Sequence, residues 1–202
     1  MQARYLSASL VLALFSIVAT AQTTLAAAPQ PLPPLVGSIA GNPGWPAAKS
    51  QDVKSPEAIL NAVYDVISGG KGQERDWNRM RSLFLPDARL IPTISVAATA
   101  DKPAHVDAVM LTIDGYIARS HGRMMANGFF EHSIHNEVEQ FGNIVQVWST
   151  YESRHNAGDA KPFARGINSF QLLNDGHRYW IVNIFWDAET PDHPIPQIYL
   201  PK

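Results

Sequence analysis

Residues 129–187 read FFEHSIHNEVEQFGNIVQVWSTYESRHNAGDAKPFARGINSFQLLNDGHRYWIVNIFWD, and the fold class follows from this segment. Val, Ile, Phe, Trp, Tyr and Thr are dense in it, which is typical of β-strands. Gly, Asn and Asp interrupt it at 141–143, 156–159 and 174–176, where they favour turns. The pattern predicts four consecutive antiparallel strands at 129–140, 144–155, 163–174 and 179–187. A meander of this kind has one face to bury, so we expect the preceding chain to cover it.

Three helices and one short strand are predicted upstream of the meander. The first helix runs from Ser55, a good N-cap followed by Pro56, to the Gly69-Gly70 pair. The second spans 77–84 and the third spans 106–125, both with apolar residues at helical spacing. Residues 89–96 are predicted to form the strand between them. This order predicts an α+β fold, with three N-terminal helices packed on a curved, mainly antiparallel sheet.

The N-terminus has the pattern of a secretory signal peptide. Arg4 precedes an apolar run at 6–19, and small-residue cleavage patterns follow it, so residues 1–27 are predicted to be removed. Residues 28–54 are rich in Pro and Gly and are predicted to be a flexible linker, which leaves 55–202 as one domain with an extended Pro-rich tail. The chain has no Cys. Export without disulfides indicates a periplasmic or secreted bacterial protein.

Charge and motifs exclude several function classes. The formal net charge is −2, which favours neither nucleic acid nor, after signal cleavage, a membrane surface. There is no Gly-rich phosphate loop and no Gly-x-Ser-x-Gly nucleophile motif. His132 and His135 lie three apart on a predicted strand, hence on opposite faces, and make poor co-ligands. We therefore expect neither a cofactor nor a metal.

Several segments together resemble the nuclear-transport-factor-2-like (NTF2-like) superfamily, in its SnoaL-like branch. They are Asp76-Trp77, LFLPDA at 83–88, Gly142, WSTYESR at 148–154, RGINSFQL at 165–172 and YWIVNIFW at 179–186. The resemblance covers about residues 55–187. It implies a cone-shaped domain with a pocket in the cone mouth, and frequent dimerisation through the outer sheet face. The superfamily includes isomerases, dehydratases, cyclases, epoxide hydrolases and plain binding modules, so the resemblance implies no single activity.

Strand alternation predicts which residues face the pocket. If Asp175-Gly176 forms a two-residue turn, Asn168 lies opposite Asn183. An assumed register for the loop between the second and third strands then places the even-numbered residues of 148–154 on the same face. Polar groups gathered on one face favour a pocket floor, and a hydrogen-bonded polar ladder inside the core is the alternative. The predicted ligand-binding residues are Tyr64, Trp148, Thr150, Arg154, Asn168, Asn183 and Phe185. The opposite face is too apolar for full exposure, so a homodimer partner, which we favour, or the Pro-rich tail is expected to cover it.

His132 and Glu152 are the candidate catalytic pair. A three-residue turn at 141–143 places them opposite each other on the pocket face, where the carboxylate would orient the imidazole as a general base. A two-residue turn gives that role to His135 instead. The alternative for Glu152 is an ion pair at the pocket rim with Arg154 and Arg165.

Three functions remain open from the sequence. The first is binding of a small, largely apolar molecule in the pocket, without catalysis. The second is a cofactor-independent lyase, isomerase or hydrolase that uses the His132–Glu152 pair. The third is a non-catalytic protein–protein interaction module. The sequence therefore does not decide whether the chain is an enzyme. We favour the three functions in the order given.

Overall fold

The structure is a computed structural model in which residues 32, 35 and 37–202 are described. The described residues from 35 onward form one compact unit. The predicted signal peptide, residues 1–27, lies outside the described residues, as does the beginning of the predicted linker. None of the described helices is long and apolar enough to cross a membrane.

Four α-helices and one short 3-10 helix form within the described residues. Their bounds are α1 Ser50–Val53, α2 Pro56–Ile67, α3 Trp77–Leu83, α4 Ile113–Asn127 and the 3-10 helix η1 Gln197–Tyr199. The three longer helices each begin at a side-chain cap: Ser55 accepts from Ala58 N, Asp76 from Arg79 N and Thr112 from Gly115 N. Each cap satisfies one of the backbone N–H groups that a helix start leaves without a partner.

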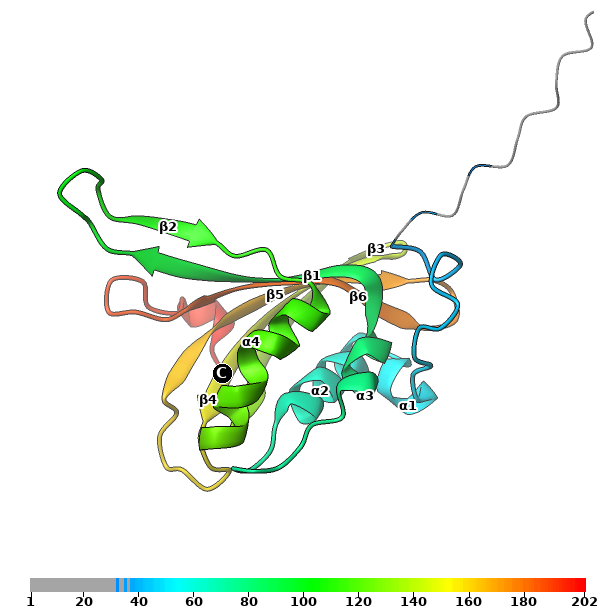
Figure 1. The fold of residues 1–202 in the computed structure, drawn as a ribbon, viewed down its shortest axis with the longest axis horizontal. Helices are drawn as coiled ribbons and strands as arrows, with labels where there is room; N and C mark the ends of the chain where they lie inside the picture. The colour runs from blue at the N-terminus through cyan, green and yellow to red at the C-terminus, as the bar shows by residue number, and fades with distance from the viewer. Residues whose placement is uncertain (1–31, 33–34, 36) are drawn as a thin grey trace, which may run out of the picture. The chain divides into compact units, whose positions relative to one another are not determined.

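The sheet has six strands, and its meander is the one that the sequence predicts. The strands are β1 Phe84–Val96, β2 His105–Ala108, β3 Phe130–Phe141, β4 Ile144–Arg154, β5 Ala164–Asn174 and β6 Tyr179–Ala188. Their order across the sheet is β2-β1-β6-β5-β4-β3. β1 runs parallel to β6, and every other neighbouring pair is antiparallel. Figure 1 shows the β1–β2 hairpin extending past the other strands. The α+β class is confirmed.

The third helix begins later than predicted. Residues 105–108 form β2, which pairs with β1, and α4 starts only at Ile113 behind its Thr112 cap. Val106 and Met110, which the helical spacing assigned to a buried stripe, are 63% and 62% exposed. The prediction joined a strand to the helix that follows it, because apolar spacing alone does not report where a cap interrupts the pattern.

The second half of the predicted linker packs against the body. Trp45 Nε1 donates to the carbonyl oxygens of Arg81 and Phe84, at 3.1 and 3.0 Å. Asp52, in α1, is 6% exposed and pairs with Arg79 at 2.8 Å. Residues 28–54 were expected to form a flexible linker, but the part that contains Trp45 and α1 is held against the body by these contacts.

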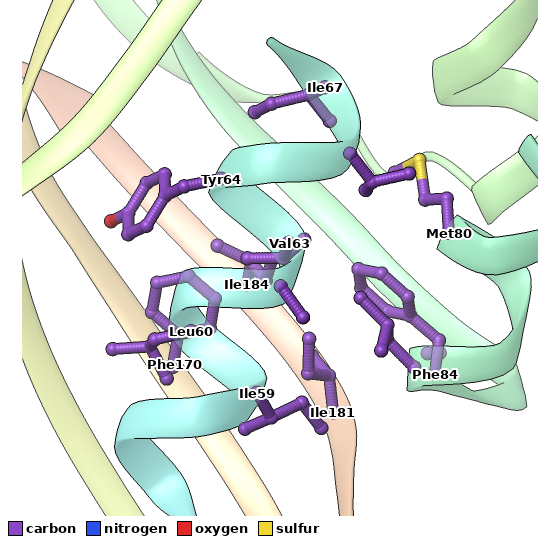
Figure 2. Packing of buried hydrophobic residues seen from close by; sticks show 14 of the residues in the cluster. Ile59, Leu60, Val63, Tyr64, Ile67, Met80, Phe84, Phe170, Ile181 and Ile184 are labelled. Atoms are coloured by element: carbon purple, nitrogen blue, oxygen red, sulfur yellow. The ribbon is translucent and has the colours of Figure 1, made fainter. Parts of the chain in front are cut away.

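The core lies between α2 and one face of the sheet, called here the inner face. Ile59, Leu60 and Val63 of α2 are almost completely buried, and Figure 2 shows them beside Phe170, Ile181 and Ile184 of the sheet. Burying each aliphatic side chain of this kind stabilises the fold by roughly 1.5–3 kcal/mol. The inner face also holds Val145, Val147 and Leu172.

The sheet register differs from the prediction in β4 and β6. Ser149 pairs with Asn168, so the odd-numbered residues of β4 face inward and the even-numbered ones face outward. The loop between β4 and β5 is therefore one residue out of step with the assumed register, which moves every side chain of β4 to the other face. In β6 an extra residue, Val182, lies between the partners of Leu172 and Gln171 and turns Asn183 outward.

The turn between β5 and β6 also differs. Asn174 pairs with Tyr179, not with His177, so four residues separate the strands. The Asp175 carboxylate accepts hydrogen bonds at 2.8 Å from the backbone N–H groups of both His177 and Arg178. This side chain stabilises the longer turn, as Asp does in many turns.

Candidate functional site

A cavity of about 500 Å³ lies between α2, α4 and the inner face of the sheet. Most of its wall is apolar, contributed by residues of α2, α3, α4, β1, β5 and β6 and of the segments that flank α4. These include Val63, Ile67, Met80, Leu90, Leu111, Met124, Phe129, Phe170, Ile184 and Trp186. Figure 2 shows the α2 side of this wall, with Val63 and Tyr64 next to each other and Ile67 one turn further along the helix. The volume falls in the range of pockets that bind small molecules.

Glu131 is the one acidic residue among the described residues that line this cavity. It lies on β3, and its carboxylate accepts a hydrogen bond from Ser153 Oγ at 2.6 Å. Burial raises the pKa of Glu131 to about 7, while hydrogen bonds from Ser153 and Asn168 oppose the shift. Burial disfavours the charged form of a carboxyl group. The group therefore exists in both protonation states near neutral pH.

A hydrogen-bonded trio lies beside this carboxylate. The Tyr64 hydroxyl is 2.7 Å from Ser149 Oγ, and Asn168 Nδ2 donates to the same hydroxyl at 3.0 Å. All three residues are buried. Burial, and secondly the charge of Glu131, raise the pKa of Tyr64, so it remains a neutral phenol. The trio satisfies polar groups that would otherwise be costly to bury.

Two further tyrosines line the cavity near Glu131. Burial is the main cause that raises the pKa of both Tyr116 and Tyr151, and the charge of Glu131 adds to each shift. Tyr151 lies over Gly166 of the neighbouring strand, where a Cβ atom would come within 2.6 Å of the tyrosine hydroxyl. A carboxyl group surrounded by three phenols can share hydrogen bonds with a polar group of a ligand.

Aromatic and basic side chains border the rest of the lining. His155 stacks on Phe163 with ring centroids 4.3 Å apart, and Phe129 contacts the same phenylalanine at 6.1 Å. Arg119 and Arg123 line the cavity from α4. Within the described part of the chain, no three His, Asp or Glu residues are grouped to hold a metal ion.

Two of the predicted ligand-binding residues, Tyr64 and Asn168, line this cavity and contact each other. Five others are directed to the outer face by the register differences and are not part of the lining: Trp148, Thr150, Arg154, Asn183 and Phe185. Thr150 is nevertheless completely buried, because its hydroxyl donates to the carbonyl oxygen of Tyr199 in the C-terminal tail at 2.6 Å.

The predicted catalytic pair is opposed across two strands, but on the outer face. His132 pairs with Glu152 in the β3–β4 ladder, and neither residue lines the cavity. Glu152 instead accepts from Arg154 at 2.6 Å and lies 3.5 Å from Arg165. His132 and Arg154 border a second hollow at the sheet edge, together with Ser68 and Asp159. The cavity thus lacks the His–Glu pair that the sequence suggested.

A bulge in β3 keeps His132 opposite Glu152 although the β3–β4 turn is one residue shorter than this pairing was expected to need. The β3–β4 turn has two residues, since Phe141 pairs with Ile144, and Ile134 is an extra residue between Ser133 and His135. His132 and His135 therefore share the outer face, contrary to the alternation expected for an unbroken strand. His135 contacts Glu137 at 2.7 Å there. The same bulge leaves Glu131 facing inward, opposite Ser153.

No protein-family model and no curated protein matches the chain. The structure is similar to an NTF2-like protein of unknown function from Pseudomonas putida KT2440, with 9% identity, TM-score 0.48 and coverage of 69% of this chain and 89% of that one. An NTF-2 like protein of unknown function from Silicibacter pomeroyi DSS-3 has 15% identity, TM-score 0.43 and coverage of 66% and 92%. A protein of unknown function with a cystatin-like fold from Nostoc punctiforme has 7% identity, TM-score 0.48 and coverage of 67% and 89%.

These similarities concern the fold alone. At such identities and TM-scores they carry no argument about activity or about the site. The function has to be argued from the cavity itself.

Proposed function

We propose that the chain binds a small, largely apolar molecule in the cavity, and that Glu131 is the polar partner of that molecule. The observation that carries the proposal is a partly buried carboxyl group with a raised pKa, facing a cavity of about 500 Å³ with mostly apolar walls. Pockets for small molecules combine such walls with few polar groups that fix orientation. Glu131, Tyr64 and Asn168 supply these groups here.

Acid–base catalysis is the second candidate function, with Glu131 in place of the His132–Glu152 pair. A carboxyl group with a pKa of about 7 can accept or donate a proton at neutral pH. The surrounding tyrosines remain protonated and can donate hydrogen bonds to a substrate oxygen. A lyase or isomerase that needs no cofactor would use such an arrangement.

Native mass spectrometry of the full chain, purified from its own host, tests the binding proposal. We expect the intact protein to carry a small molecule that is released on denaturation. The variant Ala164→Trp should lose it, because Ala164 lines the cavity and the indole would occupy the space. The control Ala160→Trp places the same side chain at an exposed position and should retain it. Equal retention by both variants, or no bound molecule at all, would contradict the proposal.

Export and self-association complete the proposal. The N-terminal sequence pattern supports action in the periplasm or outside the cell. The outer sheet face supports a homodimer, since Trp148, Val182 and Phe185 on this face remain 37%, 36% and 42% exposed beside the tail. The same native spectrum reports the subunit count, which we expect to be two.

A further inference from the structure

Two arginines of the cavity lining have no protein partner within the described part of the chain. Arg119 and Arg123 lie four residues apart on α4, both are exposed, and neither makes a hydrogen bond or an ion pair. The other described arginines all have such partners. Arg79, Arg81, Arg89, Arg154 and Arg165 pair with carboxylates, whereas Arg75 and Arg178 donate to backbone carbonyls.

The helix offers these two side chains no acidic neighbour. Positions three or four residues from Arg119 and Arg123 hold Tyr116, Gly115, Ser120, Gly122, Ala126 and Asn127, besides the other arginine. Like charges at this spacing destabilise a helix, and a bound anion would remove the repulsion. Glu131, the acid of the lining, is engaged by Ser153. Neither arginine therefore has an ion-pair partner among the described residues.

Most of the cavity wall is apolar. Leu90, Leu111 and Met124 line it, and Trp186 contacts Tyr116 edge-to-face with ring centroids 6.3 Å apart. A ligand in this cavity would meet two cationic groups from α4 and a wall that is mostly apolar apart from the polar groups around Glu131. Guanidinium groups bind carboxylate, sulfonate and phosphate oxygens through charge-assisted hydrogen bonds.

We propose that the ligand is an amphipathic anion whose single anionic group is held by Arg119 and Arg123 while its apolar part fills the cavity. The inference rests on the proposed binding function, because both use the same cavity. It adds the chemical class of the ligand and the residues that select it.

A matched pair of fluorescent probes tests the inference on the full chain. 1-Anilinonaphthalene-8-sulfonate carries a sulfonate, and N-phenyl-1-naphthylamine has the same aromatic body without it. We expect the sulfonate to bind about tenfold more tightly than the neutral probe, as two exposed charge contacts allow. The double variant Arg119→Gln/Arg123→Gln should lose this factor and bind the neutral probe as before, which also shows that it is folded.

Two further double variants separate charge at this site from charge in general. Arg119→Lys/Arg123→Lys should keep most of the preference for the sulfonate. Arg81→Gln/Arg89→Gln removes two arginines that lie outside the lining and should change neither affinity. Two results together would overturn the anion inference but not the proposed function. They are an unchanged affinity of Arg119→Gln/Arg123→Gln for the sulfonate probe, and loss of binding of the neutral probe in Ala164→Trp. Binding of neither probe to the wild-type chain would overturn the proposed function as well.

Discussion

Glu131 is the residue at which folding and pH are most directly coupled. Its pKa rises from the ordinary value of 4.5 to about 7 on folding, chiefly through burial. The folded chain therefore binds more protons than the unfolded chain between these values, and stability falls as pH rises. The contribution is complete below about pH 4.5 and is lost as pH passes about 7.

The variant Glu131→Gln should remove this dependence. In the wild type we expect the free energy of unfolding to decrease between pH 4.5 and 7.5 by up to about 3 kcal/mol from this group. Glutamine keeps the size of the side chain and cannot ionise, so urea unfolding at both pH values should give a flatter profile. Glu139→Gln, an exposed change on the same strand, is the control and should retain the wild-type slope. Identical slopes for wild type and Glu131→Gln would contradict the assignment.

Only part of the site could be read from single residues. Tyr64 follows the apolar stripe of α2, and Asn168 alternates with Phe170 on β5, so both could be placed on the inner face. Glu131 stands one residue before His132 on β3, and strand alternation alone does not indicate that it faces the cavity. Its exposure to the cavity depends on the bulge at Ile134. Tyr151 was assigned to the outer face through the same kind of register slip.

At the level of elements, Gly166 allows β4, β5 and β6 to pack closely. A Cβ atom there would lie 2.2 Å from the backbone oxygen of Asp187 and 2.6 Å from the Tyr151 hydroxyl. Both distances are far below normal contact, and one partner is backbone, so the strands would have to separate. The glycine thus fixes both the strand packing and the position of a cavity tyrosine.

Gly166→Ala should therefore destabilise the fold by at least about 2 kcal/mol, as overpacking of a tight interior does. Chemical denaturation measures the change. Gly158→Ala is the matched control, because nothing lies within 4 Å of a Cβ atom at that turn position. We expect its effect to stay within about 0.5 kcal/mol. A near-neutral Gly166→Ala variant would show that the β4–β6 packing can relax.

The elements themselves were more predictable than their registers. The four meander strands lie within one or two residues of their predicted bounds, because β-branched and aromatic density and turn residues are local signals. The bulges at Ile134 and Val182 leave no comparable signal in the sequence. Each inserts one residue and reverses which side chains face inward.

For the whole molecule, the sequence predicted the α+β class but not the complete topology. The parallel pairing of β1 with β6 joins residues 94 to 97 positions apart in the sequence, and β2 extends the sheet beyond them. Pairings of that separation depend on tertiary packing, which local patterns do not report. The outer face is shared between the tail, through Thr150 and Tyr199, and the surface proposed for a second copy.

The cavity exists only when α2, α4 and the sheet assemble, so the raised pKa of Glu131 is a property of the whole fold. A titration of the Glu131 carboxyl carbon by 13C NMR, assigned with Glu131→Gln, tests this most directly. The account predicts a midpoint at about pH 7, which moves upward when N-phenyl-1-naphthylamine displaces water from the cavity. A midpoint near the ordinary 4.5, unaffected by the probe, would contradict it.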